Sequence, residues 1–267
     1  MMKNSDEPFD YAEIKELLDE KADLYNRIKF IESDPVSIPH LFDNEDDIAI
    51  SGFLTATIAW GQRVTLIRNA RILVEKMDMA PADFVRNFQE SDLEIFNGFV
   101  HRTFNEKHCK YFLRALQRMM LLYGNLEKAF ENEENTVFSG IVEFRKRFLL
   151  EEDNIGVSRH VANPEANSAA KRLNMFLRWM IRKDNRGVDF GLWNVFKQED
   201  LICPLDVHSG GVARKLGILN RKQDDWQAAE ELTRVLKSFD ANDPVKYDYA
   251  LFGLGVFENY RKLNALQ

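Results

Sequence analysis

Apolar residues recur at intervals of three and four along most of this chain, a spacing that places them on one face of an α-helix. Residues 10–31 illustrate the pattern, with Ile14, Leu17, Leu18 and Ala22 in register. We find no convincing alternation of apolar and polar residues, the mark of a half-buried strand, and no internal repeat. The spacing predicts an all-α protein of ten or so short helices, at residues 10–31, 45–59, 63–77, 81–87, 92–98, 106–122, 125–131, 136–149, 169–183, 189–195, 208–216, 226–238 and 246–254.

The expected helices follow one another without a long linker, so we predict a single two-lobed helical domain over residues 1–267. Within it, residues 1–44 are expected to form an acidic N-terminal helix and loop, and residues 45–257 the helical core. The proline-punctuated stretch 33–42 and the polar stretch 151–168 are expected to be loops.

The sequence does not show the patterns of a metal site, a disulfide framework or a membrane span. Cys109 and Cys203 are too few for a framework and lack the partner spacing of metal ligands, so we expect a reducing, cytoplasmic location and no metal. The acidic N-terminus does not resemble a signal peptide, and no window approaches the ~18 apolar residues of a membrane span. No glycine-rich phosphate loop occurs, so no cofactor is predicted.

Charge is distributed unevenly along the sequence, although the formal net charge is −7. Residues 1–50 hold 14 acidic and 5 basic side chains, whereas residues 156–222 hold 12 basic and 6 acidic ones. Exposed charges act over a Debye length of ~8–10 Å, so a local basic patch can meet phosphate on an acidic protein. The alternative is that these charges simply alternate around exposed helices.

Lys171 stands near the start of a predicted apolar helix, in "NPEANSAAKRLNMFLRWMIR" (163–182). Ser168 is a suitable N-cap, which would put Lys171 in the first turn, where the helix dipole disfavours a cation. A lysine that loses its proton more readily is a nucleophile. The alternative is a surface lysine whose stem covers an apolar helix.

Asp206 and His208 lie two residues apart in "PLDVHSGGVARKLGI" (204–218). Asp206 can serve as the N-cap of the helix that follows, or as a carboxylate directed into a cleft. His208 can be a switch, a metal ligand or a polar cap, but no third ligand stands nearby in the sequence. Gly210 and Gly211 allow another backbone or DNA to approach closely, or relieve packing.

Gln62 falls at the junction of two predicted helices in "ATIAWGQRVTLIRNA" (56–70), between Trp60 and Arg63. An amide at an exposed helix junction can be offered to a nucleic-acid base. The alternative is a solvated glutamine in a turn.

Taken together, these segments resemble the helix-hairpin-helix DNA glycosylase superfamily, and in detail its archaeal and bacterial 8-oxoguanine glycosylase branches. There a catalytic lysine heads a helix reading K-x-x-x-x-F-L-R, as Lys171 does in "KRLNMFLR", and a catalytic aspartate lies in a D-x-H segment, as Asp206 does in "LDVH". The segment "ISGFLTATIAWGQRVTLIRNA" (50–70) is similar to the superfamily's early helix pair. The likeness spans roughly residues 45–257, and the "KRLNMFLRWM" and "PLD-x-H" blocks also look like those of an uncharacterised bacterial family.

The resemblance implies a DNA-repair N-glycosylase with an all-α, two-lobed, helix-hairpin-helix fold, acting on damaged double-stranded DNA, with an oxidised purine as a candidate base and AP lyase activity as a further step. Lys171 would attack the sugar, and Asp206 would assist it. The residues implied in DNA contact are Gln62, Arg63, His208, Arg172 and Arg214. The aromatic residues implied in the base pocket are Trp60, Phe176 and Trp179, with Trp193 as a further candidate. The alternative for each of them, which the residue type favours, is a place in the core.

The chain also departs from that superfamily. The hairpin that usually carries glycines for phosphate binding reads "ANPEANSAAK" (162–171) here, without glycine. Lys171 and Asp206 are 35 positions apart, and the insert "KDNRGVDFGLWNVFKQEDLI" (183–202) could add a helix. Two alternative functions are therefore kept besides the glycosylase. One is a non-catalytic nucleic-acid-binding module on the same fold, and the other is a helical metal-dependent hydrolase using Asp206 and His208.

Overall fold

A computed structural model describes residues 10–150, 156–258 and 260 of the chain, and these residues are mostly helical, as predicted. The α-helices are α1 (Tyr11–Tyr25), α2 (Ile28–Ile31), α3 (Glu45–Thr57), α4 (Arg63–Glu75), α5 (Pro81–Asn87), α6 (Glu106–Tyr123), α7 (Val137–Phe148), α8 (Lys171–Ile181), α9 (Val207–Lys215), α10 (Trp226–Phe239) and α11 (Tyr247–Val256). The 3-10 turns are η1 (Pro35–Ser37), η2 (Pro39–Leu41), η3 (Glu90–Phe96), η4 (Glu127–Phe130), η5 (Ser158–His160), η6 (Pro164–Ala166), η7 (Gln198–Asp200) and η8 (Pro244–Lys246).

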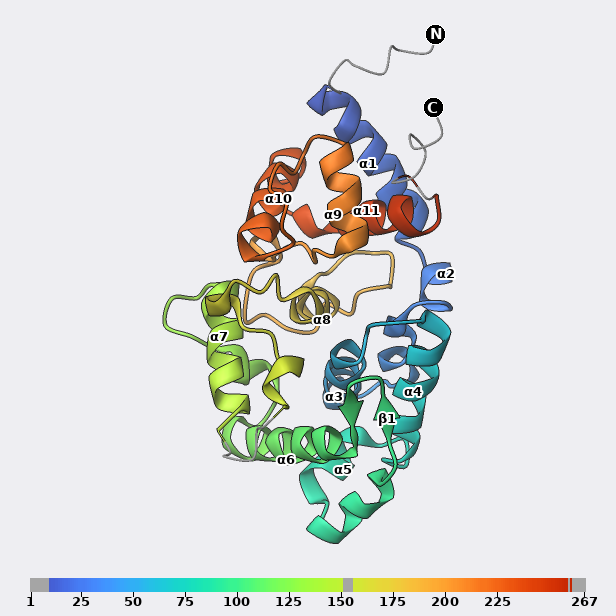
Figure 1. The fold of residues 1–267 in the computed structure, drawn as a ribbon, viewed down its shortest axis with the longest axis vertical. Helices are drawn as coiled ribbons and strands as arrows, with labels where there is room; N and C mark the ends of the chain where they lie inside the picture. Colours follow the sequence, from blue (N-terminus) through green and yellow to red (C-terminus); the bar gives the residue numbers. More distant parts are fainter. Residues whose placement is uncertain (1–9, 151–155, 259, 261–267) are drawn as a thin grey trace.

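Helix α8 runs through the middle of the molecule, with other helices on two sides of it (Figure 1). On one side α1 packs along α11, and α11 packs on α9. On the other side α3 packs on α8 and contacts α4 and α5, while α6 lies against α5 and α7. The first and last helices of the described chain are therefore neighbours, and α8 lies between the two groups.

Aromatic packing fills the space between α3, α6, α7 and α8. Phe53 of α3 lies with its ring centroid 5.8 Å from that of Phe112, 5.3 Å from Phe144 and 5.7 Å from Phe176. All four side chains are at most 1% exposed. Burial of a phenylalanine side chain stabilises the folded state by roughly 1.5–3 kcal/mol, so this cluster holds α8 against α3, α6 and α7.

Two of the predicted helices are 3-10 turns, and a third predicted helix does not form. The segments expected at 92–98 and 125–131 form η3 and η4. The helix expected at 189–195 is absent from the described chain, where the N–H groups of Phe190, Leu192 and Trp193 instead bond to the carbonyls of Trp179 and Met180. The N–H groups of this segment pair with carbonyl groups at the end of α8, so they are not available for hydrogen bonds within a helix of their own. The insert 183–202 likewise contains the short η7 instead of an extra α-helix.

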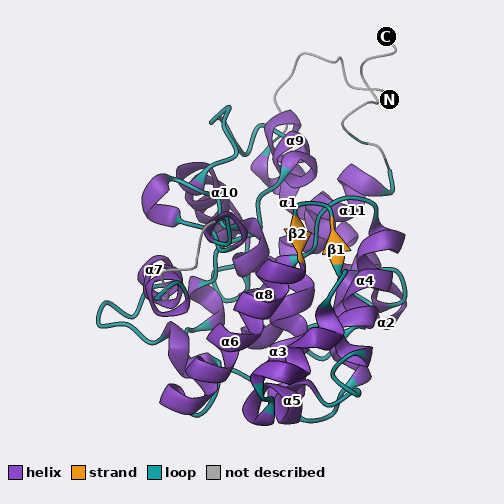
Figure 2. Ribbon diagram, turned by 60° about the horizontal axis from the view of Figure 1, so that its bottom comes forward, coloured by secondary structure: helices purple, strands orange, loops and turns teal. Residues whose placement is uncertain are grey.

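A short hairpin was also missed. Strands β1 (Val100–His101) and β2 (Phe104–Asn105) pair antiparallel, and Figure 2 shows them as the two arrows among the helices. Two residues a strand are too few for an alternating pattern to be visible in the sequence. Of the loop predicted at 151–168, residues 151–155 lie outside the described part of the chain.

The N-cap expected at Ser168 is wrong. Ala170 precedes α8 in the left-handed conformation, with φ 48°, and no side chain of the described residues caps this helix. The Ser168 hydroxyl instead accepts a hydrogen bond from the N–H of Ala170 at 3.3 Å. Lys171 is nevertheless in the first turn of α8, as expected, and is the first residue of that helix.

The positive segment 156–222 does not form one exposed basic face. Arg178 and Arg182 are 4% and 2% exposed, and both pair with the buried carboxylate of Asp189. Arg182 also pairs with Asp243, at 2.8 Å, and Arg178 with Asp248. Because these arginines are neutralised in the interior, the sequence count overstates the charge available to a phosphate.

Across the residues that the structure describes, none of the helices has the length and apolar character that crossing a bilayer demands.

Candidate functional site

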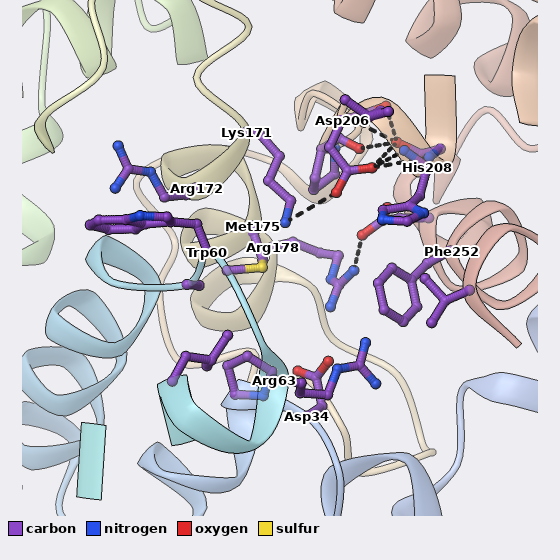
Figure 3. A pocket seen from close by; sticks show the side chains of 18 of the residues that line it. Asp34, Trp60, Arg63, Lys171, Arg172, Met175, Arg178, Asp206, His208 and Phe252 are labelled. Atoms are coloured by element: carbon purple, nitrogen blue, oxygen red, sulfur yellow. Dashed lines mark hydrogen bonds and ion pairs between the residues drawn. The ribbon is translucent and has the colours of Figure 1, made fainter. Parts of the chain in front are cut away.

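A cavity of about 580 Å³ opens where α8, α9, α11 and the segment before α4 meet. Figure 3 shows its labelled side chains reaching inward from these different parts of the chain. That volume lies within the range of pockets that bind small molecules, roughly 300–1,000 Å³. The polar and charged residues that line it are Asp34, Arg63, Lys171, Arg172, Arg178, Asp206, His208, Ser209 and Asp248.

Lys171 and Asp206 come together at this cavity, although they are far apart in the sequence. The Nζ atom of Lys171 lies 3.4 Å from Oδ2 of Asp206 (Figure 3). The two side chains are 28% and 25% exposed, so both are partly buried and still reachable from solvent. An amine and a carboxylate at this distance form an ion pair, and a proton can pass between them through one water molecule.

Asp206 is held in place by the helix that it caps. Its Oδ1 atom accepts hydrogen bonds from the backbone N–H groups of His208, at 2.7 Å, and Ser209, at 3.0 Å. The Ser209 hydroxyl accepts in return from the N–H of Asp206, at 2.9 Å, which completes a capping box. The sequence offered two interpretations of Asp206, a helix cap and a carboxylate directed into a cleft. The side chain fulfils both, because one oxygen caps α9 and the other lies at the cavity.

Burial by itself raises the pKa of Asp206. The positive charge of Lys171 and the N–H groups of Ser209 and His208 outweigh that effect, so the pKa lies below its ordinary value. Asp206 is thus a carboxylate near neutral pH, able to accept a proton or to stabilise a cation beside it.

One face of α8 lines the cavity. Lys171, Met175 and Arg178 are spaced four and three residues apart, which places them on the same side of the helix.

The two aromatic residues of α8 that were predicted to line a base pocket do not line the cavity. Phe176 and Trp179 are both 0% exposed and belong to the core, so the interpretation of these two as base-stacking residues is wrong.

Trp193 is likewise in the core. It is 6% exposed, and its ring packs edge-on against Phe176 at 5.2 Å.

Trp60 does line the cavity, and two neighbouring side chains pack against its ring. Its ring stacks on that of His160 at 5.7 Å, and the guanidinium of Arg172 lies 4.8 Å from its centre. Arg172 also donates a hydrogen bond to the carbonyl of Thr57. Burial lowers the pKa of the Arg172 guanidinium to about 10. Arg172 therefore supports Trp60 from inside the protein, instead of extending freely toward a phosphate.

The remaining predicted DNA-contacting residues have different positions. Arg63 begins α4 and lines the cavity, and His208 lines it on the α9 side. Gln62 is exposed beside Arg63, at the N-cap position of α4. Arg214 instead turns to the loop after α9, where its guanidinium donates to the carbonyls of Arg221 and Gln223 and pairs with Asp224 at 2.6 Å. The prediction that Arg214 contacts DNA therefore conflicts with its bonding to this loop.

Gly210 is explained by the same loop. A Cβ atom at this position would lie 2.7 Å from the Asp224 carboxylate and 2.9 Å from the Arg214 guanidinium. The glycine permits the close approach of another part of the protein, one of the alternatives that the sequence left open.

Sequence reasoning missed several residues of the cavity, above all Asp34 and Asp248. Asp34 is 7% exposed, and burial raises its pKa against the opposing effects of the Val36 N–H, Arg63, Arg178 and Lys171. Burial raises the pKa of Asp248 to about 6, although Arg178 and Lys171 oppose the shift. Asp34 precedes a proline and Asp248 lies in an apolar helix, but no spacing rule connects either position with Lys171.

Within the described chain, no three His, Cys, Asp or Glu side chains form a group that could hold a metal ion. His208 and Asp206 lie close together, but the Asp206 oxygens are directed to the helix N–H groups and to Lys171.

Comparison with known proteins gives one match. No curated protein and no solved structure matches the chain. Residues 34–257 match the family described as "Protein of unknown function (DUF2400)", and this region begins at Asp34 of the cavity and includes Lys171 and Asp206. Because the match covers most of its length, the chain belongs to the DUF2400 family.

Proposed function

We propose that this protein is a DNA N-glycosylase of the helix-hairpin-helix type, which removes a damaged base by means of the Lys171 amine and then cleaves the strand as an AP lyase. The observation that carries the proposal is the 3.4 Å separation of Lys171 Nζ and Asp206 Oδ2 at a cavity large enough for a nucleoside.

The backbone before α8 supports the helix-hairpin-helix assignment. Asn167 and Ala170 have φ values of 60° and 48°, the left-handed conformation that glycine adopts most easily. The resembled hairpin carries glycines at this place, immediately before its lysine helix. The turn is thus of a glycine-compatible shape, even though this chain builds it from asparagine and alanine.

The proposed reaction begins with a nucleotide extruded from the duplex, at a cost of a few kcal/mol. Asp206 accepts a proton from the Lys171 ammonium, and the freed lone pair of Nζ forms a bond to the sugar carbon C1′. The C1′–N bond to the base breaks, and its electron pair leaves with the base, which takes a proton from water. The negative charge of Asp206 stabilises the positive charge that builds on the sugar.

The covalent intermediate then supplies the lyase step. Loss of a proton from Nζ and protonation of the ring oxygen open the sugar to an imine between C1′ and Lys171. Removal of a proton from C2′ frees an electron pair that forms a double bond between C2′ and C3′. The C3′–O bond breaks at the same time, and its own electron pair leaves with the 3′ phosphate. The imine also gives the test, since borohydride donates hydride to its carbon and makes the link permanent.

The test is trapping of a duplex that carries one abasic site. Wild-type protein with borohydride should give a covalent protein–DNA band, and Lys171→Gln should abolish it. Lys197→Gln is the matched control, since Lys197 is exposed and pairs with Glu199 away from the cavity. Absence of the band with wild-type protein would overturn the lysine mechanism.

The second candidate is a nucleic-acid-binding protein without catalysis. Its support is that Arg178 and Arg182 are neutralised inside the protein and that Arg172 and Arg214 are bonded to protein carbonyls, which leaves less charge for the backbone of DNA. Salt-dependent binding of duplex DNA that is unchanged in Lys171→Gln, together with no trapping by the wild type, would select it.

A further inference from the structure

A second carboxylate lines the cavity on the α11 side, that of Asp248. Asp248 lies in the first turn of α11, and its side chain is 10% exposed, so it can be reached from the cavity. Its Oδ2 atom accepts a hydrogen bond from the guanidinium of Arg178. Among the described residues, only Arg178 is hydrogen-bonded to this carboxylate, so its other oxygen keeps its capacity to accept.

Arg178 fixes the orientation of the Asp248 carboxylate. The arginine is 4% exposed, and its Nε atom lies 3.2 Å from Oδ1 of the buried Asp189. Its Cζ atom lies 4.3 Å from the centre of the Tyr249 ring. A planar guanidinium held by a carboxylate and by an aromatic face has little freedom to turn. The oxygen of Asp248 that it binds is therefore held in place as well.

The position of Asp248 is close to the space in front of the lysine. Phe252 follows Asp248 by four residues in α11 and also lines the cavity, so both lie on one face of that helix. Figure 3 shows the guanidinium of Arg178 between Lys171 and Phe252. The carboxylate that this guanidinium binds thus belongs to the same part of the cavity as the amine.

Charged and titratable groups act on Asp248 from the elements packed around it. They are Lys171 and Arg178 of α8, Asp189 of the segment after α8, Cys203 and Asp206 before α9, and His208 of α9, which lines the cavity.

The two carboxylates of this part of the cavity have pKa values shifted in opposite directions. Burial raises the pKa of Asp248 to about 6, although the positive charges of Arg178 and Lys171 oppose the shift. The pKa of Asp206 lies below its ordinary value. Both groups are mainly ionised near neutral pH, and Asp248 is the stronger base of the two. Two acids tuned apart in one site are suited to different proton transfers.

We propose that Asp248 is the base of the lyase step and takes the proton from C2′ of the sugar bound to Lys171. The inference rests on the proposed function, because the sugar must first form an imine with Lys171. The electron pair of the C2′–H bond forms the double bond between C2′ and C3′, and the C3′–O pair leaves with the 3′ phosphate. Asp248 then passes its proton to water. Asp206 takes the lysine proton, so each carboxylate serves one proton transfer.

The experiment compares two fates of the same imine, reduction by borohydride and cleavage of the strand. Full-length protein in excess is mixed with a duplex that carries one abasic site, and the initial rates of trapping and of 3′ cleavage are measured. Asn at position 248 keeps an oxygen for Arg178 but cannot take up a proton. Asp248→Asn should still be trapped, whereas its ratio of cleavage to trapping should fall at least roughly tenfold. An unchanged ratio would overturn the inference.

Two further variants separate chemistry from folding. Asp248→Glu restores a carboxylate and should recover part of the ratio. Asp189→Asn is the matched control, because Asp189 pairs with the same guanidinium and is 0% exposed but does not line the cavity. It should destabilise the protein in urea denaturation and leave the ratio in place. An equal fall of the ratio in Asp189→Asn would show that Asp248 acts only through the position of Arg178.

The pH profile of the wild-type protein tests the inference without a substitution. Cyanoborohydride, which withstands mild acid, replaces borohydride, and the ratio cancels the amount of imine because both reactions start from it. Asp248 accepts a proton only as a carboxylate, so the ratio of cleavage to trapping should rise as the pH rises through about 6 and then level off. A constant ratio across this range would contradict the inference.

The outcomes separate this inference from the lysine mechanism. Absence of trapping by the wild type would refute the lysine mechanism and the role of Asp248 with it. Trapping by the wild type without cleavage would refute the lyase step and this role, and leave the bond to Lys171 standing. Trapping and cleavage in equal ratio by the wild type and Asp248→Asn would refute the role of Asp248 alone.

Discussion

Asp206 has one role in the fold, as the cap of α9, and another in the candidate site, as the partner of Lys171. Its Oδ1 atom holds two N–H groups of α9, and its Oδ2 atom lies against Lys171. The sequence could indicate the cap, because the residue precedes a helical pattern behind Pro204. The second contact was inferable only from resemblance, because Lys171 lies 35 positions away and no local rule connects the two residues.

Substitution of Asp206 should separate the two contributions. Asp206→Asn keeps a capping oxygen and should change the free energy of unfolding by less than about 1 kcal/mol, whereas Asp206→Ala should cost about 1 kcal/mol or more. Both should lose at least tenfold in the rate of trapping, since neither accepts a proton from Lys171. Urea denaturation and trapping on the same preparations check this, and full trapping by Asp206→Asn would contradict the proposed role of the carboxylate.

His160 gives a prediction about pH. Burial, the neighbouring His108 and the positive charges of Arg172 and Arg159 lower the pKa of His160 to about 4. Its ring is 5% exposed and lies between Trp60 and Phe104. The unfolded chain takes up this proton near pH 6.5, so the unfolded state binds more protons between pH 6.5 and 4. Stability should therefore fall as the pH drops through this window, by up to ~1.4 kcal/mol per pH unit for one proton.

The measurement is urea denaturation at several pH values, with His160→Phe as the comparison. The variant should show a shallower loss of stability between pH 6.5 and 4, whatever its stability at neutral pH. Parallel pH profiles for the two proteins would show that His160 is not the group responsible.

At the scale of a single element, the sequence predicted that α8 is a helix but did not predict how the helix begins and ends. Its apolar residues gave the helix, and the spacing of Lys171, Met175 and Arg178 could have indicated the cavity face. The cap was mispredicted, because Ser168 fits the propensity for an N-cap but the chain turns through Ala170 in a left-handed conformation. The segment after the helix was mispredicted because its hydrogen bonds go back to α8.

The left-handed turn predicts a difference between two neighbouring alanines. Ala169 and Ala170 are 8% and 2% exposed, so replacement by glycine removes a buried methyl group at both positions. Only Ala170 has a positive φ, where a Cβ atom costs roughly 1–2 kcal/mol. Ala170→Gly should therefore be at least about 1 kcal/mol less destabilising than Ala169→Gly in urea denaturation. Equal losses would argue against strain at this turn.

At the scale of the whole molecule, buried ion pairs join α8 to the C-terminal elements. Arg182 pairs with Asp189 at 2.9 Å and with Asp243 at 2.8 Å, and Arg178 pairs with Asp189 and Asp248. The sequence predicted the helical class and the existence of a large core. It could not predict this network, because charge counted along the chain does not show which arginines lie in the interior.

The network predicts a large effect of one substitution. Arg182→Leu leaves Asp189 and Asp243 without this partner inside the protein and should cost about 3–5 kcal/mol of unfolding free energy. The exposed pair of Lys197 and Glu199 is the comparison, and Lys197→Ala should change stability by less than about 1 kcal/mol. Urea denaturation of both variants checks the contrast, and a loss for Arg182→Leu as small as for Lys197→Ala would contradict it.

In the proposed mechanism the Lys171 amine forms the covalent bond to DNA, so the position of that bond on the protein tests the mechanism. Wild-type protein is reduced with borohydride on abasic-site DNA, digested with nuclease and protease, and analysed by tandem mass spectrometry. The proposed mechanism predicts a deoxyribose-derived mass on Lys171. The same mass on another lysine or on the terminal amine, with Lys171 unmodified, would contradict it.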